Sequence, residues 1–85
     1  MKQFNDLQFK KHPQKDGIIT RITFDNGYGA SVVKSPYTYG GDKGLYELAV
    51  FKDGEITYAT PITDDVIGYL RPEDVTDVMT KIQQL

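Results

Sequence analysis

The sequence has no cysteine, no tryptophan and only one histidine among its 85 residues. Without cysteine there is no disulfide framework and no thiolate for catalysis or metal binding. The histidine, His12, precedes Pro13 and has no Cys, Asp or Glu at metal-ligand spacing, so we interpret it as a solvated loop residue. Nothing in the spacing of the other polar residues joins a nucleophile or base to an orienting partner. We therefore expect no enzymatic activity, no metal site and no cofactor.

Long hydrophobic runs are also missing, because no apolar segment approaches the roughly 20 residues that cross a bilayer. The first residues, MKQFNDLQFKKH, lack the apolar core and small-residue cleavage site of a secretory signal. The composition that remains, 39% hydrophobic and 26% charged, is typical of a globular domain. A chain of this length has room for one core, so we predict a single domain over residues 1–85 with no membrane partner.

The densest group of β-forming residues lies between Leu45 and Tyr58, and we predict that it is the central hairpin of a sheet. Two loop lengths are compatible with this segment. A two-residue loop of Asp53-Gly54 pairs Phe51 with Ile56 and spreads apolar residues over both faces.

The alternative is a three-residue loop of Lys52-Asp53-Gly54, which pairs Val50 with Ile56 and Leu48 with Tyr58. Because side chains on a strand alternate between faces, this register collects the apolar residues on one face. We prefer it for that reason. Phe51 is then the only large apolar residue on the outer face, where it is either exposed, covered by the N-terminal segment or covered by a second copy of the chain.

We predict another hairpin before Leu45–Tyr58 in the sequence. Residues 18–24 alternate in polarity, and a three-residue loop of Asp25-Asn26-Gly27 pairs Phe24 with Tyr28 and places apolar groups on one face. Further upstream, residues 6–11 alternate weakly, and we predict a short edge strand whose lysines discourage pairing with another sheet.

The C-terminal segment carries the clearest helix signal. Pro72 suits the first helical position, and Glu73 and Asp74 complement the positive end of the helix dipole. Apolar residues then recur at helical spacing, at Val75, Val78, Met79, Ile82 and Leu85. Before this helix we expect a polar turn at residues 63–65 and a buried segment at residues 66–70. The predicted fold class is α+β: an antiparallel sheet of about five strands built from two hairpins and covered by one C-terminal helix.

The segment Ser35–Gly44, SPYTYGGDKG, is the least ordinary part of the sequence. Its glycines do not follow the spacing of a P-loop or of a dinucleotide-binding fingerprint. A glycine-rich backbone can form an anion-binding nest, with Lys43 adding charge and a tyrosine offering a stacking face. The alternative is a mobile connection between the hairpins whose glycines only supply turns.

Three segments of the chain share a pattern with known sequences: residues 26–29 (NGYG), residues 39–50 (YGG, then GLYELAV) and residues 60–70 (TPITDDVIGYL). Together, over roughly residues 18–85, they resemble a family of small tailed-bacteriophage proteins of unassigned function. The resemblance implies an accessory or early product, absent from the virion and made in the host cytoplasm. It brings no catalytic residues.

We therefore expect a non-enzymatic accessory protein that binds a host macromolecule, a protein above all. Tyr28, Tyr37 and Tyr39 would supply rigid amphipathic contacts, and Phe51 would add an apolar patch. A second copy of the chain, in a twofold homodimer, is a further alternative for the partner.

Two alternatives remain. One is a binder or sponge for a small anionic, nucleotide-like ligand held by Gly40, Gly41, Lys43 and a stacked tyrosine. The other is weak nucleic-acid binding, for which the basic candidates are Lys10, Lys11, Lys15 and Arg21. A net charge of −2 makes nucleic acid the less favoured partner.

Overall fold

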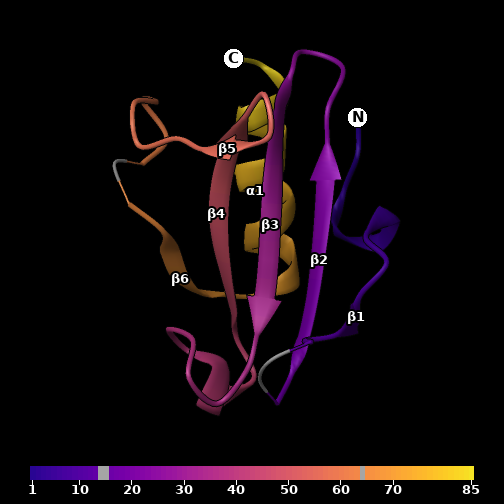
Figure 1. Ribbon diagram of the computed structural model, residues 1–85, viewed down its shortest axis with the longest axis vertical. Helices are drawn as coiled ribbons and strands as arrows, with labels where there is room; N and C mark the ends of the chain where they lie inside the picture. Colours follow the sequence, from indigo (N-terminus) through magenta and orange to yellow (C-terminus); the bar gives the residue numbers. More distant parts are fainter. Residues whose placement is uncertain (14–15, 64) are drawn as a thin grey trace.

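A computed structural model describes residues 1–13, 16–63 and 65–85 and places one α-helix against one face of an antiparallel sheet (Figure 1). The strands are β1 (Lys10–Lys11), β2 (Ile18–Thr23), β3 (Tyr28–Lys34), β4 (Tyr46–Lys52), β5 (Glu55–Ile56) and β6 (Ile67–Leu70). Two short 3₁₀ helices, η1 (Phe4–Asp6) and η2 (Gly41–Lys43), and the helix α1 (Pro72–Gln83) complete the described elements. The strand order is β1-β2-β3-β4-β5, and β6 also pairs with β4. The predicted α+β class is confirmed.

The hairpin of β2 and β3 forms as the sequence predicts. The amide of Phe24 donates to the carbonyl of Tyr28 at 2.7 Å, which closes a three-residue loop. Beyond it, Ile22 pairs with Ala30, so the apolar side chains of both strands share the inner face. Phe24 and Ala30 are buried there.

The predicted register of the β4–β5 hairpin is wrong. Phe51 pairs with Ile56, so the loop is the two-residue Asp53-Gly54. Both loop residues are left-handed, with φ of 52° and 87°, as a type I′ turn requires. Ile56 consequently lies on the outer face and is 46% exposed instead of joining the core.

Strand β6 explains why the hairpin ends early. It occupies the same edge of β4 and pairs Ile67 with Leu48, the position that the predicted register gave to Tyr58. One edge cannot carry two strands at the same residue, so β5 stops at Ile56 and Tyr58 remains exposed.

The predicted first strand is shorter than expected. Only Lys10 and Lys11 pair with β2, at the predicted edge, while the preceding residues turn inward. Phe4 and Phe9 pack against the ring of Tyr46, with centroid distances of 5.1 and 5.5 Å. Burial of these aromatic rings offsets the sheet hydrogen bonds that a longer strand would have made.

Helix α1 covers the inner face of β3 and β4 (Figure 1). Its buried residues, Val75, Met79 and Ile82, belong to the predicted apolar stripe, whereas the stripe's last member, Leu85, is exposed. The start of the helix has a cap that the sequence analysis did not identify, because a carboxylate oxygen of Asp74 accepts a hydrogen bond from the Arg71 amide at 3.0 Å.

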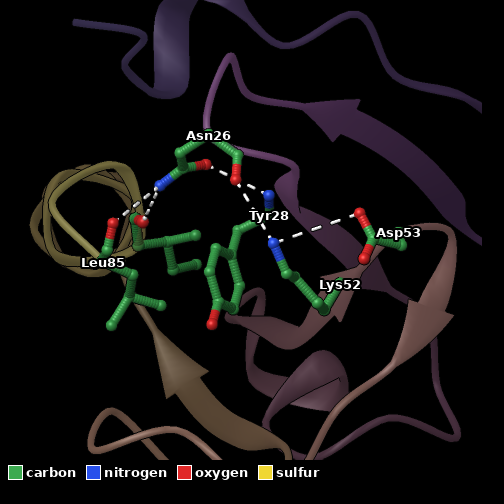
Figure 2. A network of polar contacts seen from close by, with 6 residues as sticks. Asn26, Tyr28, Lys52, Asp53 and Leu85 are labelled. Carbon is green, nitrogen blue, oxygen red and sulfur yellow. Dashed lines mark hydrogen bonds and ion pairs between the residues drawn. The ribbon is translucent and has the colours of Figure 1, made fainter.

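A polar network joins both hairpin turns to the end of α1 (Figure 2). The side-chain amide of Asn26 donates to the carbonyl of Ile82 at 2.9 Å, and its oxygen accepts from the amide of Tyr28 at 3.1 Å. The amide of Asp53 donates to the carbonyl of Gly27 at 3.0 Å. Asn26 thus gives a carbonyl in the last turn of the helix a side-chain partner, and the bond from Asp53 to Gly27 joins the two turns.

Candidate functional site

The loop between β3 and β4 folds back on itself through short-range hydrogen bonds. The amide of Ser35 donates to the hydroxyl of Thr38 at 3.0 Å, and the Thr38 hydroxyl donates to the Ser35 carbonyl at 3.1 Å. Gly40 and Gly44 are left-handed, with φ of 86° and 77°, and flank η2. The glycines therefore do supply turns, but within a hydrogen-bonded structure.

Four amides of this glycine-rich loop, including those of Gly41 and Lys43, already donate to carbonyls of the loop. Gly41 donates to Thr38, Lys43 donates to Gly40, and the amides of Gly44 and Leu45 also donate to carbonyls of the loop at 3.0–3.1 Å. An anion nest needs several amides that point toward one empty point. These four do not, so they add no support to the ligand alternative, which stays a prediction.

The loop packs closely against β6 at two glycine–tyrosine contacts, Gly40 with Tyr69 and Gly68 with Tyr39. We call these two contacts the interlock. The amide of Tyr69 donates to the carbonyl of Tyr39 at 3.1 Å. A Cβ on Gly40 would lie 2.9 Å from the Cα of Tyr69, and a Cβ on Gly68 would overlap the Cβ of Tyr39. Both glycines are therefore required for the backbones to approach this closely.

A third contact holds the loop to β4. The amide of Tyr39 donates to a carboxylate oxygen of Glu47 at 2.7 Å. Tyr39 is thus fixed through both its amide and its carbonyl, to two different strands. A backbone held at both groups fixes the point from which the side chain leaves the surface.

Tyr69 has an unusual backbone conformation. Its φ is 58°, in the left-handed region that residues with a Cβ rarely adopt. It lies where β6 bulges against β4, between the pairs that Tyr46 and Leu48 make. The bulge leaves the ring 56% exposed, and the ammonium of Lys43 lies 5.9 Å from the ring centroid. The prediction that Tyr69 is buried is therefore wrong.

These observations define a candidate site, which we call the tyrosine cluster: Tyr37, Tyr39 and Tyr69. Their exposed fractions are 72%, 62% and 56%, among the largest of the apolar residues that the structure describes. Tyr37 lies two residues before Tyr39, and its amide donates to the hydroxyl of Ser35 at 3.1 Å. The signal in the sequence for Tyr69 was Gly68, because glycine inside a strand marks a bulge or a close backbone approach.

The other predicted aromatic site residues lie at the opposite end of the sheet. Phe51 is on the outer face, as predicted, but its ring is half-buried beneath the guanidinium of Arg21, 3.8 Å from the centroid. Arg21 is held there by a 2.8 Å hydrogen bond to the carbonyl of Gly54. Phe51 lies four positions after Glu47 on β4, roughly 13 Å along the strand. Within the chain, the side chain that covers Phe51 is Arg21.

Tyr28 is half-buried at that same end, with the ammonium of Lys52 located 4.5 Å from its ring centroid (Figure 2). It packs beside the end of α1 and does not join the tyrosine cluster. Of the basic candidates for nucleic-acid binding, Lys10 and Lys11 belong to β1 and Arg21 covers Phe51, while Lys15 lies outside the described residues.

Arg71 and Asp74 have shifted pKa values, and both lie at the start of α1. Within residues 1–13, 16–63 and 65–85, no three His, Cys, Asp or Glu side chains gather in a way that could hold a metal ion. Hydrogen bonding to Arg71 lowers the pKa of Asp74, and the same hydrogen bond raises the pKa of Arg71. This pair belongs to the helix start. Over the described part of the chain, no helix has the length and apolarity needed to span a membrane.

Compared with family models, with curated proteins and with solved structures, the chain shows no significant match to any of them.

Proposed function

We propose that this protein is a non-enzymatic binding module whose tyrosine cluster is the central contact for another protein. The observation that carries the proposal is the interlock at Tyr69, whose amide bonds to the Tyr39 carbonyl while its own backbone is left-handed. A left-handed residue with a Cβ costs roughly 1–2 kcal/mol and persists only where its surroundings enforce it. Here the enforced conformation directs a large ring to the surface.

Tyrosine suits such a role for physical reasons. Its ring buries a large apolar area, its hydroxyl can bond to a partner, and only two side-chain torsions must be fixed on binding. Because the backbones of Tyr39 and Tyr69 are already held, part of the ordering cost of association is met before the partner arrives. Protein interfaces concentrate their binding energy in a few aromatic residues of this kind.

The nature of the partner follows from the surrounding charges and from the phage resemblance, which remains a prediction. Lys43 and Glu47 provide one charge of each sign beside the rings. A mixed rim of this kind suits a protein surface better than a polyanion such as nucleic acid. Under the phage resemblance, the partner would be a protein of the bacterial host and the encounter would take place in the host cytoplasm.

The test is affinity capture with tagged protein from a bacterial lysate, quantified by mass spectrometry. The test variant is Tyr39→Ser. The control is Tyr58→Ser, because Tyr58 is 53% exposed and follows β5, away from the tyrosine cluster. We expect one or a few proteins that the native chain and the control enrich equally and that the test variant loses.

The captured protein is then purified and its Kd is measured for the same three chains. Loss of a central interface tyrosine costs about 2 kcal/mol, which corresponds to roughly 30-fold weaker binding. Equal Kd values for both variants would rule out the tyrosine cluster as the contact. If capture enriches nothing above the level of an unrelated tagged protein, the proposal of a protein partner fails.

A further inference from the structure

The loop between β2 and β3 contains a dipeptide that can modify itself. The chain has two asparagines, Asn5 and Asn26, and Asn26 is followed by Gly27. Asparagine before glycine is the pair most prone to spontaneous loss of its side-chain amide, because glycine has no Cβ to hinder attack by its own nitrogen. Asn5 is followed by Asp6, whose side chain hinders the same attack. Asn26 is therefore the reactive asparagine of this sequence.

The reaction needs only water and a base. A base removes the proton from the Gly27 nitrogen, which then forms a bond to Cγ of Asn26. The bond between Cγ and Nδ2 breaks, and the departing nitrogen takes a proton from the solvent and leaves as ammonia. The product is a cyclic succinimide. Water opens this ring at Cγ, which leaves aspartate at position 26, or at the main-chain carbon, which leaves isoaspartate. The net change is the gain of one water and the loss of one ammonia.

The attacking nitrogen is restrained in the folded chain. The amide of Gly27 donates to the carbonyl of Phe24 at 3.1 Å, so the proton that must leave is already hydrogen-bonded. The carbonyl of Gly27 accepts from the amide of Asp53 at 3.0 Å. Gly27 is thus held through both of its backbone groups, and its nitrogen cannot turn toward Cγ without the loss of a hydrogen bond.

The side chain that must be attacked is held by the end of α1 (Figure 2). The side-chain amide of Asn26 donates to the carbonyl of Ile82 at 2.9 Å and to the main-chain oxygen of Leu85 at 3.5 Å. Its oxygen accepts from the amide of Tyr28 at 3.1 Å. Cγ becomes free to react only when these partners separate. The end of a helix is where local opening costs least, so the last turn of α1 controls this separation.

The product would not fit the same contact. An ionised carboxylate has no hydrogen to donate, and at position 26 its charge would face the oxygens of Ile82 and Leu85 at the negative end of the helix dipole. The ammonium of Lys52 lies close by, but it already donates to the carbonyl of Asn26 at 3.4 Å and lies 4.0 Å from the carboxylate of Asp53. Deamidation therefore replaces an attraction between the loop and α1 with a repulsion.

We propose that Asn26 is a deamidation site controlled by the last turn of α1, and that its conversion releases this turn from the β2–β3 hairpin. The closed turn blocks the reaction, each opening allows it, and the carboxylate that forms opposes reclosure. Because the conversion does not reverse, the converted fraction increases with the time that the turn has spent open. The site does not involve the tyrosine cluster, so this proposal is independent of the proposed function.

The experiment incubates purified full-length protein in mildly alkaline buffer made with ¹⁸O-labelled water, either folded or in concentrated guanidinium chloride. Mass spectrometry of proteolytic peptides then follows the entry of label at each asparagine. We expect conversion at Asn26 to be at least about tenfold slower in the folded chain than in the denatured chain, because the reaction waits for local opening. Asn5 is the internal control, and its conversion should be much slower than that of Asn26 in the denatured chain.

Two glycine substitutions on α1 test the control by its last turn. Lys81→Gly weakens the last turn at an exposed position and should speed conversion of folded Asn26 about fivefold, the ratio that corresponds to a glycine inside a helix. The control is Glu73→Gly, also exposed but in the first turn, which should leave the rate within about twofold.

Asn26→Asp reproduces the direct product and tests its effect on α1. Amides in the last turn should exchange about threefold faster in Asn26→Asp than in Asn26→Ala, since only the carboxylate repels the helix oxygens. The proposal is overturned if Asn26 converts equally fast in folded and denatured protein, or if it does not convert when denatured. It is also overturned if both glycine variants change the rate equally, or if Asn26→Asp exchanges no faster than Asn26→Ala.

Discussion

The left-handed conformation of Tyr69 gives the sharpest test of the site's geometry, because its cost can be separated from the loss of the ring. We compare Tyr69→Ala with Tyr69→Gly. Both variants remove the ring, so their difference in free energy of unfolding reports only on the backbone at φ 58°. Alanine retains the left-handed penalty of roughly 1–2 kcal/mol, and glycine does not. Glycine loses roughly 0.4–1 kcal/mol through the greater freedom of its unfolded chain.

The difference leaves the glycine variant more stable by about 0.5–1 kcal/mol. In a domain of this size each kcal/mol shifts the Tm by about 4–8 °C, so the glycine variant should melt about 2–8 °C higher. The assay is urea and thermal unfolding followed by circular dichroism. The matched control is the same pair of substitutions at Ile56, an exposed strand residue without positive φ, where alanine should be the more stable by about 0.5–1 kcal/mol. An alanine variant at Tyr69 that equals or exceeds the glycine variant would refute the argument.

Three further predictions concern stability. Leu48→Ala should cost about 2–5 kcal/mol in urea unfolding because Leu48 is fully buried, whereas Ile56→Thr should cost less than about 0.5 kcal/mol; a large loss at Ile56 would favour the register that buries it. Asn26→Ala should cost about 1–2 kcal/mol and speed amide exchange in the last turn of α1, since the helix loses its side-chain partner; unchanged exchange would contradict this. The folded-state pKa of Asp74 is lowered, so its contribution is full above about pH 4 and is lost as the pH falls through the folded value. Asp74→Asn should therefore flatten the pH dependence of stability below about pH 4, and an identical acid profile for both proteins would show that the hydrogen bond to Arg71 contributes nothing.

Local signals in the sequence were sufficient for part of the fold. The hairpin of β2 and β3 follows from alternating side chains around residues 25–27, and α1 follows from Pro72 and an apolar stripe. In both elements the deciding interactions lie within about a dozen residues, where periodicity is a direct consequence of geometry.

The β4–β5 register could not be obtained in this way, because a distant segment decides it. Ile67 occupies the edge position beside Leu48, and nothing between Leu45 and Tyr58 indicates that competition. The preference for one apolar face assumed that Ile56 needed burial, but α1 and the N-terminal aromatics already fill the inner face. Tertiary competition therefore overrode a locally reasonable pattern.

In the candidate site, too, local sequence indicates some of the residues, whereas the positions of the others depend on distant contacts. Tyr37 and Tyr39 stood out because they precede the glycine pair at residues 40–41, and both are exposed. Tyr69 was assigned to the core because its neighbours are apolar, and only the bulge against β4 turns it outward. Phe51 was expected to add an apolar patch, but the guanidinium of Arg21 lies over its ring. Arg21 belongs to β2, a strand that is not adjacent to β4. Contacts of this kind depend on topology, which a single sequence does not specify.

The central claim is that the tyrosine cluster contacts a partner protein, and site-specific photocrosslinking in bacterial cells tests it most directly. A photoreactive phenylalanine analogue replaces Tyr37 in one chain and Tyr58 in another, two exposed positions, the first in the loop between β3 and β4 and the second after β5. We expect a discrete crosslinked protein from the Tyr37 position, reduced at least about tenfold when Tyr69→Ser is added, and none from the Tyr58 position. The same crosslinked protein at equal yield from both positions, or no crosslink from the Tyr37 position, would contradict the claim.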